Sequence, residues 1–188
     1  MSNLSKDIQL LFHHTIVEGS EDSYKELFQA LFPALFRFAT CLLHSLEQAE
    51  EVASDVMLRL WQSRMQMTEV ENIKMYALIM VRNQSLNIVK KNSRARIISL
   101  EDIEGEAVYS GQDPEQALVQ SQLHLKIQEA IQHLPVRSRL VFRLVKEEGL
   151  SYKQVAELLS ISVKTVDAHL VAAMRKLTEA LRVRSDRA

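Results

Sequence analysis

Small and basic side chains recur at helical spacing near the end of the chain, in a pattern suited to DNA. Lys164, Ala168, Val171 and Arg175 share one face of a predicted helix. Cations of this kind bind phosphates or guanine, whereas small apolar side chains contact the methyl group of thymine. The spacing therefore predicts a helix that reads the major groove of DNA.

A short preceding helix would hold that reading helix in place. Ser151 is a candidate N-cap and Gln154 follows at the capping-box spacing, which predicts a helix over about residues 152–159. Residues 160–162 form the turn, and the small Ala156 allows a close crossing of the two helices. The second helix would bury Val166, Leu170, Ala173 and Leu177. These features indicate a helix-turn-helix, and the alternative is an ordinary helical hairpin.

A second polar ridge lies on a helix predicted over residues 72–92, with Asn72 as its cap. Two amides and three cations fall at i, i+4, i+7, i+8 and i+11: Asn83, Asn87, Lys90, Lys91 and Arg94. Cations suit phosphates, and amides can contact base edges or the backbone. Tyr76 and Trp61 are the nearby candidates for stacking on bases, although a tryptophan is more often a core residue. This ridge is a candidate DNA contact, with a solvated helix end as the alternative.

An acidic surface lies on a strongly amphipathic helix predicted over residues 46–62. Its apolar face comprises Ala49, Val52, Ala53, Val56, Met57 and Leu60. Glu50, Glu51 and Asp55 lie away from that face and form a negative patch that could dock a basic partner. Acids near a helix N-terminus are also favoured by the helix dipole and usually stay solvated. Composition alone favours this second interpretation.

The composition predicts an all-α fold with two small helical domains. The 188 residues include four glycines and three prolines, and strand patterns are weak. Residues 97–121 hold six acidic residues and no basic one, whereas residues 22–96 and 122–188 carry net charges of +2 and +5. We therefore expect an N-terminal extension (1–21), a first domain (22–96) and a second domain (122–188). An acidic linker (97–121) joins the domains and runs into the first helix of the second.

Proline sets the remaining helix boundaries expected in the first domain. Pro33 should end or kink a helix, which leaves helical segments over residues 24–32 and 34–46. Residues 63–71 are expected to form a polar loop before the helix that Asn72 caps.

Proline and glycine also divide the second domain. Asp113 and the proline after it should start a helix that runs to about residue 133. Pro135 opens the next helix, which should reach about residue 146, and Gly149 is its expected stop. With the helix-turn-helix, this domain should contain four helices.

The sequence argues against enzymes, secreted proteins and membrane proteins. We find no phosphate-binding loop, nucleophile elbow or clustered acid–base pair, so we expect no catalytic residue, no cofactor and no small-molecule substrate. The N-terminus lacks a secretory signal, and the apolar stretch 27–43 is too short and broken to span a bilayer. Cys41 is the single cysteine, which excludes an intramolecular disulfide and favours a reducing compartment.

A metal-dependent sensor is a further alternative. Cys41 and His44 stand at i, i+3, and with His13 and His14 they could ligate zinc. The histidine pair lies far away in sequence, and no second pair has metal-ligand spacing. We therefore expect no metal site, but a buried thiol and partly buried imidazoles.

Three motifs in this order resemble the bacterial group IV, or extracytoplasmic-function, sigma factors of the sigma-70 family. They are AEEVASDVMLRLWQ at residues 49–62, NIKMYALIMVRNQSLNIVKK at residues 72–91, and LPVRSRLVFRL at residues 134–144 just before the helix-turn-helix. The resemblance covers roughly residues 24–181. It implies two helical domains, sigma region 2 and sigma region 4, joined by the acidic linker.

The resemblance assigns roles to the surfaces of the first domain. The amphipathic helix would bind a coiled coil on the largest subunit of core RNA polymerase through Glu50, Glu51, Asp55, Arg59 and Gln62. The ridge from Asn83 to Arg94 would meet the −10 element, with Asn83 in the family's recurrent Arg-Asn pair. Residues 63–71 would supply much of a pocket for a base extruded from the non-template strand. Binding energy would drive this opening without nucleotide hydrolysis.

In the second domain, the resemblance implies that one helix face meets the −35 element in the major groove. This face comprises Lys164, Thr165, Asp167, Ala168, Val171, Ala172 and Arg175. His169 and Lys176 are expected nearer the core edge, where they would contact phosphates. Ser160 stands in the turn where many relatives have glycine, which puts the turn geometry under some strain. The acidic linker would thread the RNA path of the polymerase or serve as a disordered tether.

The implied function is that of a cytoplasmic transcription initiation factor, which is not an enzyme. Its partners would be core RNA polymerase and promoter DNA, which it would help to melt. An anti-sigma factor, membrane-bound or cytoplasmic, would hold it inactive by covering the same surfaces. The competing class is a DNA-binding regulator of the response-regulator output type, but residues 1–110 lack the strands of a receiver domain. The linker further predicts that the two domains are arranged differently in the free and bound states.

Overall fold

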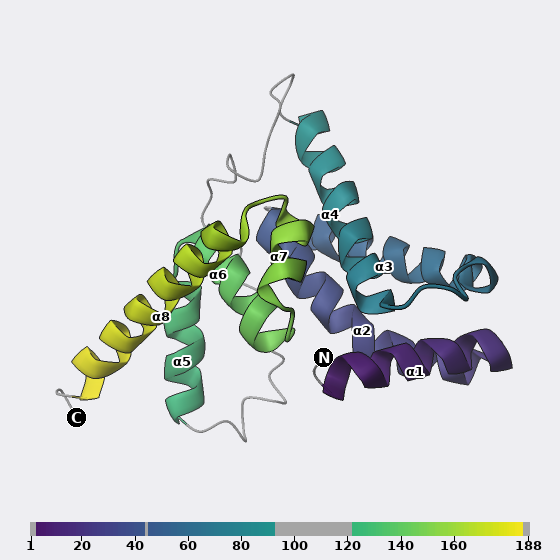
Figure 1. Ribbon diagram of the computed structural model, residues 1–188, viewed down its shortest axis with the longest axis horizontal. Coiled ribbons are helices and arrows are strands. Elements are labelled where there is room, and N and C mark those ends of the chain that lie inside the picture. The colour runs from purple at the N-terminus through teal and green to yellow at the C-terminus, as the bar shows by residue number, and fades with distance from the viewer. Residues whose placement is uncertain (1–2, 44, 93–121, 186–188) are drawn as a thin grey trace.

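The computed structural model describes residues 3–43, 45–92 and 122–185, and the regular elements within them are all helical (Figure 1). This confirms the predicted all-α class. The acidic linker and the helix start expected at Asp113 lie outside the described residues. None of the described helices combines the length and the apolar character needed to cross a membrane.

The first domain is built around a central helix. Its elements are α1 (Asn3–Glu18), α2 (Glu21–Leu42), α3 (Leu46–Gln62), the short 3-10 turn η1 (Arg64–Gln66) and α4 (Ile73–Asn92). α2 packs against α1, α3 and α4. Side-chain oxygens of Ser20, Ser45 and Asn72 accept hydrogen bonds from backbone N–H groups in the first turns of α2, α3 and α4. The predicted cap at Asn72 is thus confirmed, and α3 spans the predicted residues.

Most of the N-terminal extension is the helix α1, which belongs to the core of the first domain. Ile8 and Phe12 are almost fully buried. The buried hydroxyl of Thr15 donates to the carbonyl oxygens of Leu11 and Ser23, at 2.8 and 3.2 Å. The spacing of Ile8, Phe12 and Thr15 is helical, so the signal for this helix was present in the sequence.

Pro33 was predicted either to end or to kink a helix. The first alternative is wrong, because α2 runs through Pro33 to Leu42. Pro33 is exposed, whereas Leu31, Ala34 and Leu35 beside it are buried. Proline in a helix interior costs about 3 kcal/mol. Burial of large apolar side chains on both sides, at about 1.5–3 kcal/mol each, outweighs that cost. The helix expected to reach residue 46 also stops earlier than predicted.

The second domain packs its helices around α8. Its elements are α5 (Gln122–Gln132), α6 (Val136–Phe142), the π-helical turn η3 (Arg143–Glu147), α7 (Tyr152–Leu159) and α8 (Val163–Ser185). α8 packs against α5, α6 and α7. The four helices are as predicted, except that the α-helix after Pro135 gives way to η3 at Arg143. Gly149, at φ 70°, supplies the left-handed residue that ends this segment.

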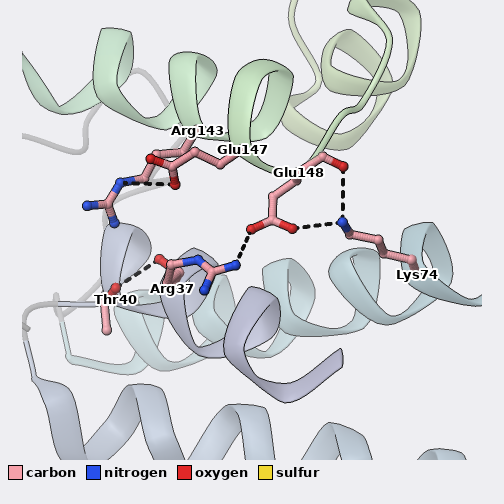
Figure 2. A network of polar contacts seen from close by, with 6 residues as sticks. All are labelled: Arg37, Thr40, Lys74, Arg143, Glu147 and Glu148. Carbon is pink, nitrogen blue, oxygen red and sulfur yellow. Dashed lines mark hydrogen bonds and ion pairs between the residues drawn. The ribbon is translucent and has the colours of Figure 1, made fainter. Parts of the chain in front are cut away.

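The two domains touch through an apolar core that runs across both, and through an ion-pair network between them (Figure 2). α7 packs against α4, and α6 packs against α2. The carboxylate of Glu148 lies 2.7 Å from the Arg37 guanidinium and 2.7 Å from the Lys74 ammonium. Lys74 Nζ also donates to the carbonyl oxygen of Glu148 at 3.0 Å. We call these three residues the Glu148 latch.

The latch holds a buried negative charge. Burial by itself would raise the pKa of the Glu148 carboxyl. Attraction to Lys74, together with hydrogen bonds from Lys74 and Arg37, outweighs burial, and the pKa lies below its ordinary value. The side chains of Glu148 and Lys74 are 5% and 1% exposed. The Glu148 carboxylate is therefore charged at neutral pH, and both side chains of this pair are shielded from water.

Candidate nucleic-acid interface

The helix-turn-helix begins with the predicted capping box. The N–H of Ser151 donates to the side-chain oxygen of Gln154 at 2.9 Å, and the N–H of Gln154 donates to Ser151 Oγ at 3.3 Å. Ser160 ends α7 in the left-handed conformation, at φ 55° and ψ 43°. The N–H of Ile161 then donates to the carbonyl oxygen of Ala156 at 3.0 Å. The turn therefore forms with a left-handed Ser160, at the position where the resemblance indicated strain because many relatives have glycine.

α8 is the reading helix that the spacing predicts. Ser162 Oγ accepts from the N–H of Thr165 at 3.0 Å and caps its start. The predicted inner face is buried: Val166, Leu170, Ala173 and Leu177. Of the predicted −35 residues, six are exposed to solvent: Lys164, Asp167, Ala168, Val171, Arg175 and Lys176. Thr165, His169 and Ala172 are half-buried along the flanks.

Two of these side chains differ from expectation in how they could meet DNA. Lys176, which we expected near the core edge, is exposed. His169 does lie at that edge, with Nδ1 3.5 Å from the hydroxyl of Ser138. Burial, and secondarily repulsion by Arg137, lower the pKa of His169. At neutral pH the imidazole is therefore uncharged, so it can offer a phosphate an N–H group but not a cation.

The polar ridge of α4 projects into solvent as predicted. Asn83, Asn87, Lys90 and Lys91 are all exposed, and Arg94 lies outside the described residues. The neighbouring Arg82 turns towards the other domain, where it donates to Ser160 Oγ at 2.8 Å. Asn83, the first of the −10 candidates, therefore directly follows the residue that contacts the turn before α8.

Trp61 is part of a packed cluster at the end of α3. Its ring lies 4.9 Å from the ring of Tyr24. The Arg64 guanidinium lies 3.9 Å above the Trp61 ring and also donates to the Trp61 carbonyl oxygen at 2.8 Å. Trp61 is therefore half-buried between Tyr24 and Arg64, so it lies outside the buried core although both ring contacts restrict its access to bases. Tyr76, on the exposed side of α4, is the aromatic side chain still accessible for stacking.

The acidic face of α3 is open to solvent. The predicted apolar face of this helix is buried in full, with each of its six side chains at 2% exposure or less. The candidate polymerase contacts on the other side are all exposed: Glu50, Glu51, Asp55, Arg59 and Gln62. A face of this kind can dock a basic surface without any rearrangement of the helix.

Nothing in the described residues gathers metal ligands. No group of three or more His, Cys, Asp or Glu side chains could hold a metal ion in the part of the chain that the structure describes. His13 and His14 are exposed, contrary to the partly buried imidazoles expected, and His44 lies outside the described residues. Burial raises the pKa of the Cys41 thiol, and nearby Arg143 and Arg139 partly oppose that rise. The cysteine is therefore a neutral thiol at physiological pH.

Two side chains that matter to these surfaces were not singled out from the sequence. Lys74 lies at the start of α4 and is buried against Glu148. Gln9 lies on α1, and its side-chain amide forms hydrogen bonds with backbone atoms of Val70 and Ile73, where the loop after α3 meets α4. No local pattern distinguishes either from an ordinary exposed residue, because their partners lie at least 61 residues away.

Family models match both domains of the chain. The model for sigma-70 region 2 matches residues 27–95, and that for sigma-70 region 4 matches residues 124–177. The ECF RNA polymerase sigma factor SigE of Mycolicibacterium smegmatis is 23% identical over 171 residues. That match covers 91% of this chain and 66% of the relative, so the chain spans about two thirds of the relative's length.

Solved structures with a similar fold include two complexes. The sigma factor RpoE from Bartonella quintana, crystallised with the anti-sigma factor NepR, matches with a TM-score of 0.57 and 22% identity over 85% of this chain and 97% of that one. CnrH, in complex with the cytosolic domain of CnrY, matches with a TM-score of 0.54 and 16% identity over 93% and 96%. At these identities the likeness concerns the fold.

Proposed function

The chain belongs to the sigma-70 family as an extracytoplasmic-function sigma factor, and from this premise we propose that it starts transcription at specific promoters. It binds core RNA polymerase, recognises −35 and −10 elements, and assists melting of the DNA. Sigma region 2 occupies residues 22–96 and is completed by α1, and sigma region 4 occupies residues 122–188. The observation that carries the proposal is the match of both sigma regions, in chain order, to two domains with exposed polar faces.

Region 4 reads the −35 element through α8. Lys164 and Arg175 are exposed cations suited to phosphate or guanine, and Ala168 and Val171 between them suit thymine methyl groups. His169 and Lys176 contact phosphates at the flank. Because α8 is braced by α6 and α7, its outward face is presented as a rigid unit.

Region 2 binds both the polymerase and the −10 element. The acidic face of α3 docks on a basic surface of core RNA polymerase. The ridge of α4 follows the DNA backbone with Lys90 and Lys91, while Asn83 and Asn87 contact bases or sugars. The loop of residues 63–71 receives an extruded base, and binding energy offsets the few kcal/mol that extrusion costs.

The remaining parts of the proposal concern control and location. The protein acts in the cytoplasm, where polymerase and promoters are found, and it uses no cofactor and catalyses no reaction. An anti-sigma factor holds it inactive. The support is that both similar structures are complexes, one of them with a protein described as an anti-sigma factor.

The described arrangement suits the free protein better than the promoter-bound one. α7 contacts both α4 and α8. Packed helices lie about 8–10 Å apart, so α4 and α8 are within about 20 Å of each other at these contacts. Elements about 25 base pairs apart are separated by about 85 Å of B-form DNA. The two domains must therefore separate before both elements can be read together.

A binding experiment with core RNA polymerase tests the proposal. Wild type should co-elute with the polymerase, and the double variant Glu51→Lys, Asp55→Lys should not. The matched control is Glu18→Lys, Glu26→Lys, which makes the same charge change at exposed positions of α1 and α2 and should bind like wild type. If folded wild type, free of any inhibitor, does not bind, the stand-alone DNA-binding regulator becomes the better interpretation.

A further inference from the structure

The side chain of Gln9 joins the N-terminal helix to the loop between α3 and α4. Gln9 Nε2 donates to the carbonyl oxygen of Val70 at 2.7 Å, and Gln9 Oε1 accepts from the N–H of Ile73 at 2.8 Å. The Val70 carbonyl can only accept and the Ile73 N–H can only donate, so a single orientation of the amide satisfies both. Gln9 therefore spans the point at which the loop ends and α4 begins.

Gln9 is well placed to act as a fixed support. Its neighbour Ile8 is 1% exposed and Phe12, one turn later, is also 1% exposed, which anchors this part of α1 in the core. The N–H of Ile73 is one of the first N–H groups of α4, which have no partner within their own helix. α1 packs against α4 and η1, and the segment that joins α3 to α4 lies beside it (Figure 1).

The loop itself is a chain of short backbone turns. The N–H groups of Gln66, Met67 and Val70 donate to carbonyl oxygens three residues earlier, at 2.9, 3.1 and 3.1 Å. Within the loop, the Met67 side chain is buried. Exposed side chains surround it: Met65, Gln66, Thr68 and Glu69. Because the turns follow one another directly, a shift at Val70 moves the exposed side chains relative to α4.

We propose that Gln9 is a positioning residue for −10 recognition. Acting through Val70 and Ile73, it holds the loop of residues 63–71 in the conformation that discriminates the extruded base. This inference rests on the proposed function and deepens it. It gives α1, which lies outside the match to sigma-70 region 2, a part in base selectivity.

Transcription from a promoter library measures this selectivity. Holoenzymes made with wild type, Gln9→Met or Gln29→Met transcribe templates randomised in the −10 and −35 elements, and the transcripts are sequenced. Gln29 is exposed on α2, so Gln29→Met makes the same chemical change away from the loop. We expect Gln9→Met to reduce the preference for the best −10 base about tenfold, while the −35 preference stays unchanged. Gln29→Met should behave like wild type.

The outcomes separate positioning from a general structural role. A variant that is merely less stable yields fewer transcripts with unchanged base preferences, and that result would overturn the proposal. Absence of transcripts with wild type itself would overturn the proposed function, and the role of Gln9 with it.

Hydrogen exchange on the free chain gives a second reading that needs no polymerase. Gln9→Met removes both bonds, and the Ile73 amide should exchange about tenfold faster. Gln9→Glu keeps an acceptor for Ile73 but sets a carboxylate oxygen against the Val70 carbonyl oxygen, so protection at Ile73 should fall between that of wild type and that of Gln9→Met. Unchanged exchange at Ile73 in Gln9→Met would show that Gln9 does not support the loop.

Discussion

Replacing Glu148 by glutamine tests how strongly the two domains are held together. Glu148→Gln keeps the size of the side chain but removes the charge that faces Lys74 and Arg37, each 2.7 Å away. Removing one partner of a buried pair typically costs about 3–5 kcal/mol. Arg37 is 42% exposed and is partly compensated by water, and Lys74 keeps its bond to the carbonyl oxygen at position 148. We therefore expect a loss of about 2–3 kcal/mol of unfolding free energy.

Urea denaturation of the full chain at pH 7 measures this loss. The matched control is Glu147→Gln, which removes the neighbouring carboxylate. Its partner Arg143 is 3.8 Å away on the same turn, and neither side chain is fully buried, so the control should lose about 1 kcal/mol or less. Adding Lys74→Met to Glu148→Gln should recover part of the loss, because no buried cation then lacks its carboxylate. Equal losses for Glu148→Gln and Glu147→Gln would refute the reasoning.

Three further results are expected. The difference in unfolding free energy between wild type and Glu148→Gln should be constant at neutral pH. It should shrink as the pH falls below the ordinary carboxyl pKa of 4.5. A depressed folded-state pKa contributes its full stability above the unfolded value and loses it as the pH falls through the folded-state value. A difference that grows on acidification would contradict this. Val171→Ser should weaken binding of holoenzyme to its best −35 element by about 1 kcal/mol in fluorescence anisotropy, with no effect on unrelated duplexes. Lys90→Ala with Lys91→Ala should reduce the slope of log affinity for single-stranded −10 DNA against log salt by about 1.4, and an unchanged slope would exclude phosphate contacts there.

Local sequence patterns were sufficient to predict the bounds and the buried face of a helix that has an N-cap residue and one regular apolar face. α3 combines a serine cap at Ser45 with an unbroken inner face, and its bounds and buried side chains are as predicted. The helix-turn-helix is similar, because Ser151 and Ser162 cap its two helices. Such segments are determined by residues within one or two turns, which a single sequence displays directly.

The continuation of α2 through Pro33 could not be predicted from local sequence rules. Taken alone, proline within a helical pattern indicates an end or a kink. Its exposed position on α2 was not visible locally, because it depends on which side of the helix α1, α3 and α4 cover. The helix continues because the buried face on either side of Pro33 is stabilised by tertiary packing.

The contacts between distant segments could not be predicted at all. Lys74 is a charged residue on a helix, and such residues are mostly exposed, yet a carboxylate 74 positions later makes its burial possible. The same holds for Gln9, whose two partners are backbone atoms of another segment. For most of the site residues the sequence predicted which side chains are exposed, but Thr165 and Ala172 are half-buried and Lys176 is more exposed than expected. The sequence could not show that the −10 ridge begins beside Arg82, which contacts the turn before α8.

Loosening the Glu148 latch should also strengthen binding to core RNA polymerase. If the polymerase binds the chain with its domains separated, the closed form lowers the apparent affinity in proportion to the fraction of open chains. If Glu148→Gln weakens the closed form by about 2–3 kcal/mol, the ratio of open to closed chains rises about 30- to 150-fold, since 1.4 kcal/mol is a factor of ten. In equilibrium titrations, Glu148→Gln should bind more tightly than wild type by up to this factor, and Glu147→Gln should match wild type. Weaker binding by Glu148→Gln would mean that the latch persists in the complex, and the domains would then have to reach the promoter by another rearrangement.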